Sequence, residues 1–276
     1  MSLGINTNIY HKEMKWNRNS FLGWSISISI LIFLGMVFYP VLMQGDMLKQ
    51  IEAFFENPFM KNLMTAFGAS IEVMSSPLGF YSTRNAMFIM LLGSFFSILF
   101  AGKILAQEER EKTAEFLLSK PVTRMEIVWS KLAVFFTYLV ALNVVILVVG
   151  FTSLEIFKGD KNFRMVDFLI HTFYTFLLML VFGAIGFFIS LLKKRGRPIT
   201  NLSIGIIVGC YFIDALSKIT PSVDKLGYIS PIKFVDSRVI NPEYSLVWWR
   251  VCYFLGISFL LFGLSFVLYR RKDISS

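Results

Sequence analysis

The residues that could take part in chemistry gather in one stretch of the chain, residues 102–131. Its sequence is GKILAQEEREKTAEFLLSKPVTRMEIVWSK, and it is the only long run that is dense in charges of both signs. Carboxylates and cations mixed along a helix form an amphipathic surface that a partner protein can grip. The stretch is therefore interpreted either as a protein-binding element or as a solvated connector, and it does not resemble a catalytic centre.

Other residue types that support catalysis or metal binding lack the required spacing. The sequence contains no G-x-x-x-x-G-K-[ST] loop for phosphates, no H-E-x-x-H and no G-x-S-x-G. His11 and His171 are too few for the usual zinc site, and Cys210 and Cys252 both lie in apolar runs. We expect no enzyme activity, metal or cofactor in this chain, so energy for any transport must come from another protein.

The composition predicts an integral membrane protein, with 55% hydrophobic and 16% charged residues in a chain of 276. A helix needs about 20 mostly apolar residues to cross the hydrocarbon layer. Six segments reach or approach this length, near residues 21–43, 85–105, 127–150, 168–192, 198–217 and 248–269. The predicted fold is all-α, with six transmembrane helices in one domain over residues 1–276 and no separate soluble domain.

The distribution of basic residues predicts the orientation of these spans. Lys and Arg are concentrated in four short segments, residues 12–18, 103–124, 193–197 and 270–272. Short basic segments stay on the cytoplasmic side of a membrane. Both termini and the stretch 102–131 are therefore expected in the cytoplasm. Because membrane topology accounts for the net charge of +9, no nucleic-acid partner is expected.

The charged stretch is predicted to be a helix that leads into the third span. Residues 104–118 have high helix propensity, and Pro121 closes the helix because the residue before a proline avoids helical geometry. Thr123 and Glu126 form a T-x-x-E pattern, which predicts a capping box at the start of the next helix. Lys131 follows near the cytoplasmic end of this span, and we expect its long side chain to reach the membrane surface.

Several features of the outer segments and later spans have two interpretations each. Short amphipathic or re-entrant helices are predicted over 43–84 and 218–247, either packed on their own spans or forming an outer gate. Gly205 and Gly209 form a small-xxx-small ridge, which is either a subunit contact or a chance pattern. Asp214 is expected to reach water or, alternatively, a polar cavity between subunits. For His171, a packing or interface role is preferred to a proton relay.

The charged stretch resembles a signature of the permease subunits of bacterial type-2 ATP-binding cassette (ABC) exporters, the ABC-2 type permease family. In that signature an acidic residue, a basic residue, a threonine, a Leu-Leu pair, a proline and a basic residue precede a lysine in the next span. The matching residues here are Glu108 or Glu109, Arg110, Thr113, Leu117, Leu118, Pro121, Arg124 and Lys131. An S-P-x-x-F segment at 230–234 and the ending at 271–273 also fit, whereas Lys112 replaces a glycine found in many relatives.

The resemblance implies that the chain is the permease domain of a half-transporter in the bacterial plasma membrane. Two permease copies, or one copy and a close homologue, would lie side by side in the bilayer. Each would be bound by one of two separate cytoplasmic ABC ATPase subunits that carry the ATP and Mg. The alternative function is a non-transporting membrane scaffold or immunity-type binding protein.

The resemblance also assigns roles to individual residues. The 104–121 helix would be the coupling helix that docks on the ATPase, and the first and fifth spans would meet across the subunit interface. The implied docking residues are Glu108, Glu109, Arg110, Thr113, Glu115, Leu117, Leu118, Pro121 and Arg124, and the implied interface residues are Gly205 and Gly209.

Overall fold

The computed structural model describes residues 4–43, 49, 53, 55–61, 70–110, 122–192, 199–219, 221–235, 239 and 244–271. Across these ranges every regular element is a helix, which confirms the all-α prediction. The long helices are α1 (Thr7–Leu42), α6 (Ala86–Arg110), α8 (Arg124–Phe157), α9 (Met165–Leu192), α10 (Thr200–Ile219) and α11 (Trp248–Arg271). The short ones are α4 (Ile71–Ser75), α5 (Pro77–Phe80), the π-helix η1 (Tyr81–Asn85), and the 3-10 helices η2 (Pro221–Ile229) and η3 (Pro231–Phe234).

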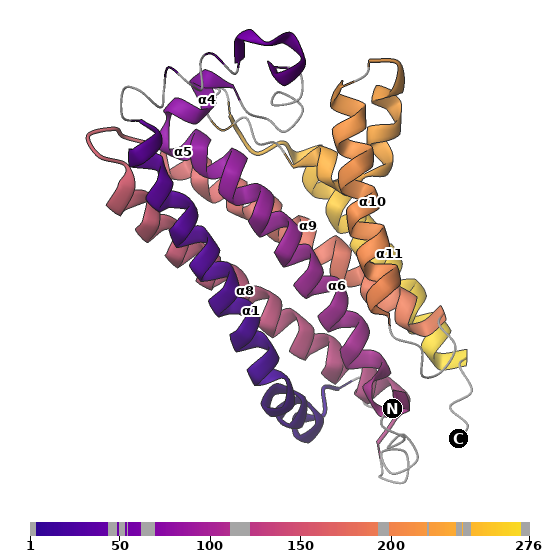
Figure 1. Cartoon of the computed structure of the whole chain (residues 1–276). Coiled ribbons are helices and arrows are strands. Elements are labelled where there is room, and N and C mark those ends of the chain that lie inside the picture. The colour runs from indigo at the N-terminus through magenta and orange to yellow at the C-terminus, as the bar shows by residue number, and fades with distance from the viewer. Residues whose placement is uncertain are drawn as a thin grey trace.

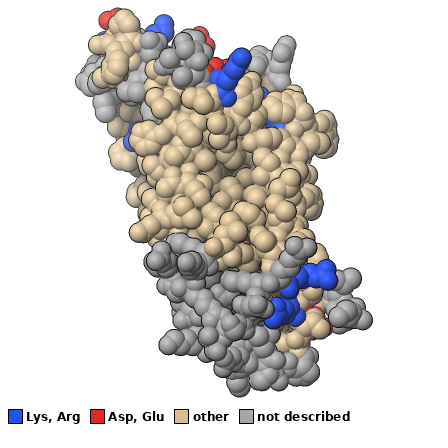
Figure 2. All heavy atoms as spheres, turned by 90° about the vertical axis from the view of Figure 1, so that its right-hand side faces the viewer, with Lys and Arg blue, Asp and Glu red and all other residues tan. Residues whose placement is uncertain are grey.

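Six helical segments are long and apolar enough to cross a membrane, and they coincide with the six predicted spans. They are Thr7–Leu42, Pro77–Leu105, Arg124–Phe157, Met165–Leu192, Thr200–Ile219 and Trp248–Arg270. The largest difference is in α1, which begins at Thr7 rather than near residue 21. Figure 2 shows a belt of uncharged residues across one face, with the described Lys, Arg, Asp and Glu side chains toward its two ends. The chain is therefore a multi-pass membrane protein.

The helices are arranged around α9 (Figure 1). This helix packs against α6, α8 and α11, while α1 lies along α8 and α10 packs on α6. In the most apolar window of each span, 72% of α9 is buried but only 22% of α1 and of α10. Helix α9 is thus the centre of the bundle, and α1 and α10 are peripheral. The start of α1 and the end of α11 lie at the bottom of Figure 1, where α6 also ends.

Glycine allows α6 and α9 to approach closely. A Cβ atom built on Gly186 of α9 would lie 2.2 Å from the backbone oxygen of Ile98 in α6. Ser97 also donates a hydrogen bond from α6 to the Met179 carbonyl of α9. Small residues at helix contacts are the usual means of bringing helices together in lipid. Within this chain the close contact is therefore made by Gly186.

The predicted glycine ridge on α10 has a different environment. No heavy atom from another part of the described structure lies within 4 Å of a Cβ built on Gly205 or Gly209. The ridge is consequently open on the surface of this chain. The pattern of small residues alone did not distinguish this open ridge from the packed glycine of α9.

Short helices follow α10, as predicted for the outer segment 218–247. Helix η2 turns back beside α10 (Figure 1). Ser230 then caps η3 by accepting a hydrogen bond from the Ile232 amide at 3.3 Å. Phe234 is buried, and its ring centroid lies 4.1 Å from that of Tyr253 in α11. The S-P-x-x-F segment thus packs against the last span, α11, through Phe234.

Replacing Gly186 with alanine tests the close contact between α6 and α9. The added methyl group meets a backbone oxygen that cannot rotate away, so we expect a loss of about 1–3 kcal/mol in unfolding free energy, typical of overpacking. Gly263→Ala in α11 is the matched control, because no neighbouring atom lies within 4 Å of its built Cβ. Unfolding of the purified proteins in detergent measures both effects. Equal stability of the two variants would contradict the assigned contact.

Candidate functional site

The charged stretch begins as a direct continuation of the second span. Helix α6 runs without interruption from Ala86 to Arg110, so its last turns form the first part of the predicted 104–118 helix. Helix α8 begins at Arg124, at the same end of the bundle (Figure 1). We call this end of the bundle the elbow end, and the link over residues 111–123 the elbow. The remainder of the predicted helix lies outside the described residues.

The structure places only some of the predicted docking residues. Glu108, Glu109 and Arg110 belong to the last turn of α6, but their side chains lie outside the described part of the chain. Arg124 is the first residue of α8. The other five, Thr113, Glu115, Leu117, Leu118 and Pro121, lie outside the described residues. Their role in docking stays a prediction.

The predicted capping box at the start of α8 is confirmed. The Thr123 amide donates to Glu126 Oε2 at 3.0 Å, and the Glu126 amide donates to Thr123 Oγ1 at 3.2 Å. These reciprocal bonds satisfy two amides that the first helical turn leaves without partners. The direction in which the chain leaves the elbow is therefore fixed by local hydrogen bonds.

Lys131 is buried at the elbow end, and the prediction that its side chain reaches the membrane surface is wrong. Its Nζ lies 3.7 Å from Glu13 Oε1 of α1, and both side chains are 1% exposed. The ammonium group also donates a hydrogen bond to the Ile104 carbonyl of α6. A buried charge requires such partners because leaving water is costly. Lys131 therefore joins α8 to α1 and α6 shortly after the elbow.

Asn17 holds the carboxylate of Glu13 in place. Its Nδ2 donates to Glu13 Oε2 at 3.2 Å and to the Glu13 carbonyl at 3.0 Å, one helical turn earlier. Asn17 is itself completely buried. We call the set of Glu13, Asn17, Lys131 and the Ile104 carbonyl the junction. It combines an ion pair with the hydrogen bonds that a buried pair needs to keep one geometry.

Hydrogen bonds on either side of the junction attach the start of α1 to α8. The Asn6 amide donates to Ser130 Oγ at 2.8 Å, and Tyr10 and Thr137 hydroxyls are 3.0 Å apart. Tyr138 donates its hydroxyl to the Met14 carbonyl. The first turns of α1 are therefore fixed to α8 along their length rather than lying free of the bundle.

Sequence reasoning missed Glu13 and Asn17 as functional candidates. A lysine within an apolar span indicates that a buried acceptor exists, but it does not identify which one. The signal that could have found the partner is the spacing of Glu13 and Asn17, four residues apart and thus on one helix face. The first span was predicted to begin near residue 21, so Glu13 and Asn17 lay outside it. Their shared face becomes apparent only because α1 begins at Thr7.

The structure also places the two ionisable residues of the later spans. His171 is buried within α9, in agreement with a packing role. Asp214 is buried as well and lines a small cavity of this chain, so it does not reach open water directly. Over the described ranges, no three His, Cys, Asp or Glu residues are grouped as a metal site would require.

Removing the Lys131 ammonium tests the junction. Lys131→Met removes the ammonium group beside the buried Glu13 carboxylate, so we expect the unfolding free energy to fall by about 3–5 kcal/mol. The double variant Glu13→Gln with Lys131→Met removes both charges and should recover part of this loss. Lys158→Met is the control, because its pair with Glu155 is partly exposed and contributes little. A double variant no more stable than Lys131→Met alone would contradict the ion pair.

Comparison of the sequence with known proteins identifies the family of this chain. No curated protein matches the sequence significantly. The profile of the family described as ABC-2 family transporter protein matches residues 7–274, which is nearly the whole chain and includes α1, the elbow and all six candidate spans. The chain belongs to the ABC-2 family of transporter proteins, as a membrane-spanning component.

Proposed function

We propose that the chain is the permease subunit of an ATP-driven exporter, coupled to separate cytoplasmic ATPase subunits through the helix at 104–121. The observation that carries this proposal is the junction, which ties three spans together next to the elbow. A displacement of the elbow would move α6 and α8 directly, and Lys131 and Glu13 would carry the same displacement to α1.

The need for a separate ATPase follows from the sequence. An ATPase with a phosphate-binding loop holds the phosphates of ATP with a glycine-rich loop and a lysine. This chain contains no such loop. ATP and Mg would therefore bind to the partner subunit. The mixed charges of Glu108, Glu109 and Arg110, at the end of α6, suit a polar groove on that subunit.

The proposed orientation places the elbow end in the cytoplasm. Basic residues are concentrated in the sequence segments 12–18, 103–124, 193–197 and 270–272. The start of α1 and the ends of α6 and α11, which include described parts of three of these segments, lie at this end (Figure 1). Short basic segments remain cytoplasmic. Both termini would then be cytoplasmic. This orientation also makes the elbow accessible to a soluble ATPase.

ATP binding would drive transport by shifting the permease between two conformations. Closure of the ATPase pair would tilt the two elbows and open the path between the permease copies toward the outside. The capping box supports this mechanism, since Thr123 and Glu126 fix the start of α8 relative to the elbow. The junction supports it further, because a force applied at α8 reaches α1 and α6 through side chains that are buried and held by an ion pair and hydrogen bonds.

A second permease copy would contact the peripheral helices α1 and α10. The open ridge of Gly205 and Gly209 allows a partner helix to come close to the α10 backbone. Large apolar side chains are exposed on α10 around this ridge, namely Leu202, Ile204, Phe212 and Leu216. We infer that this surface forms part of the subunit interface together with α1.

Changing three predicted docking residues tests the coupling. The triple variant Glu109→Lys, Arg110→Glu and Leu118→Ala should lose co-purification with the ATPase and ATP-dependent export, because charge matching and one apolar contact are removed. The triple variant should keep the thermal midpoint of the isolated permease. Reversing the Asp224–Lys233 pair, as Asp224→Lys with Lys233→Glu, is the control, because this pair lies away from the elbow. Survival of both ATPase binding and export in the triple variant would rule out the docking assignment.

Bulky residues on the α10 ridge test the subunit contact. Gly205→Leu with Gly209→Leu should prevent close helix approach and shift the protein in detergent from dimer to monomer, as measured by light scattering. Gly256→Leu with Gly263→Leu in α11 is the control, since both glycines are equally open. A dimer that persists in the α10 variant, or is lost in both variants, would argue against this interface.

A further inference from the structure

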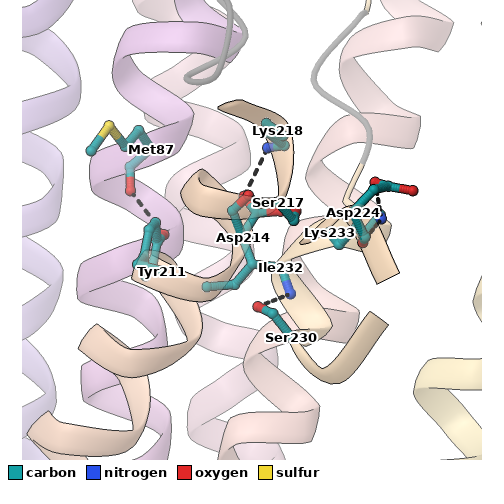
Figure 3. A network of polar contacts seen from close by, with 9 residues as sticks. All are labelled: Met87, Tyr211, Asp214, Ser217, Lys218, Asp224, Ser230, Ile232 and Lys233. Atoms are coloured by element: carbon teal, nitrogen blue, oxygen red, sulfur yellow. Dashed lines mark hydrogen bonds and ion pairs between the residues drawn. The ribbon is translucent and has the colours of Figure 1, made fainter. Parts of the chain in front are cut away.

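A small cavity lies where α6 begins and α10 ends, at the end of the bundle opposite the elbow. Figure 3 shows several of its lining residues. The cavity is bounded by η1, the start of α6, α10 and η3, and its volume is about 40 Å³. Polar side chains line it together with the apolar residues Met87, Met90, Ala215, Ile232 and Val235. This is room for about three water molecules, far below the size of a pocket that encloses a whole drug-sized ligand. The cavity can therefore hold only one small group, or one end of a larger molecule. One of its walls is the π-helix η1, a rare geometry that is frequent at functional sites.

The hydroxyl groups that line the cavity act as acceptors toward a ligand. Ser82 and Thr83 both donate to the Gly79 carbonyl at 2.9 Å. The Tyr211 hydroxyl donates to the Met87 carbonyl at 3.3 Å, as Figure 3 shows. A hydroxyl has one proton and two lone pairs. Because the three protons are used on backbone carbonyls, the lining offers oxygen lone pairs to a ligand.

Asp214 adds a negative charge to this lining. The residue is 6% exposed, and its Oδ2 lies 2.7 Å from Lys218 Nζ. Its other oxygen, Oδ1, is buried and accepts no hydrogen bond from the described residues. A buried carboxylate oxygen without a donor is costly and rare. Asp214 therefore lines the cavity with one carboxylate oxygen whose acceptor capacity no described donor uses.

Lys218 indicates which kind of donor fits. Its side chain is 41% exposed and reaches Asp214 from the rim of the cavity. The carboxylate thus already accepts a primary ammonium group at a short, charge-assisted distance. Because Lys218 is exposed and has a flexible stem, its ammonium can exchange with another one.

We propose that this cavity is a binding site for the protonated primary amine of a ligand. Asp214 Oδ1 is the anionic acceptor, and the hydroxyl oxygens of Tyr211 and Thr83 accept the remaining N–H groups. Lys218, which contacts Oδ2 of the same carboxylate, repels a second ammonium group and leaves the cavity when the ligand binds. The amine comes either from a small soluble molecule or from an aminophospholipid headgroup. The site is independent of the ATPase coupling proposed above.

Thermal unfolding of the full-length protein in phosphatidylcholine nanodiscs tests the site, with ethylammonium as the probe. Ethylammonium should raise the unfolding midpoint in a concentration-dependent way, whereas tetramethylammonium, which has no N–H group, should not. Asp214→Asn should weaken the apparent affinity at least about tenfold, the value of one charged hydrogen bond. Asp224→Asn is the matched control, since Asp224 also pairs with a lysine, at 2.6 Å, but lies outside the cavity lining. Equal shifts with the two cations, or an unchanged affinity in Asp214→Asn, would overturn the proposal.

A second variant keeps the carboxylate and removes the competitor. Lys218→Met should raise the affinity for ethylammonium severalfold, while Lys233→Met should leave it unchanged. This variant decides the question even if Asp214→Asn fails to fold, because a lower or unchanged affinity in Lys218→Met would overturn the proposal. A larger shift with sodium than with ethylammonium, lost in Asp214→Asn, would identify an inorganic cation site instead and would also overturn it.

Nanodiscs that contain phosphatidylethanolamine distinguish the two sources of the amine. If the lipid headgroup occupies the cavity, added ethylammonium will shift the midpoint less in these nanodiscs than in phosphatidylcholine, and Asp214→Asn will remove the difference. If a soluble amine is the ligand, the shift will be the same in both lipids. Either result supports the site, provided that ethylammonium binds in phosphatidylcholine nanodiscs.

Discussion

The close approach of α6 and α9 determines where the other helices can lie. In lipid there is little hydrophobic force between helices, so packing depends on how near two backbones can come. Gly186 lets α9 reach the Ile98 carbonyl of α6, and Ser97 adds a hydrogen bond across the same contact. The remaining helices pack around this pair, with α11 on α9, α10 on α6, and α1 and α8 on the side away from α10.

Two lysine–carboxylate pairs at opposite ends of the bundle differ in exposure and therefore in behaviour. Lys131 and Glu13 are both almost completely buried, and Asn17 restrains the carboxylate. A pair of this kind holds one geometry because each alternative leaves a charge without a partner. Lys218 is 41% exposed beside the buried Asp214, so water can replace its contact. The first pair fixes helices to one another, whereas the second can open.

The membrane spans could be predicted from the sequence because the length of an apolar run can be read from a single continuous segment. All six spans were located in this way, and the capping box at Thr123 and Glu126 followed from a four-residue pattern. The junction could not be predicted, because the partner of Lys131 lies in another helix and no local pattern selects Glu13. For the same reason Gly186 was not distinguished from Gly205, since packing depends on what faces each glycine. The docking residues were predicted by resemblance alone, and their role stays a prediction.

The length of α8 has a consequence for how the protein sits in a bilayer. Its 34 residues extend over about 51 Å at 1.5 Å per residue, well beyond the hydrocarbon thickness of about 30 Å. Such a helix tilts or projects to match the bilayer. Because Lys131 fastens α8 to α1 and α6 near one end, the three helices share that tilt. A change in bilayer thickness would therefore act on the three helices together and would change the angle at which α8 leaves the elbow.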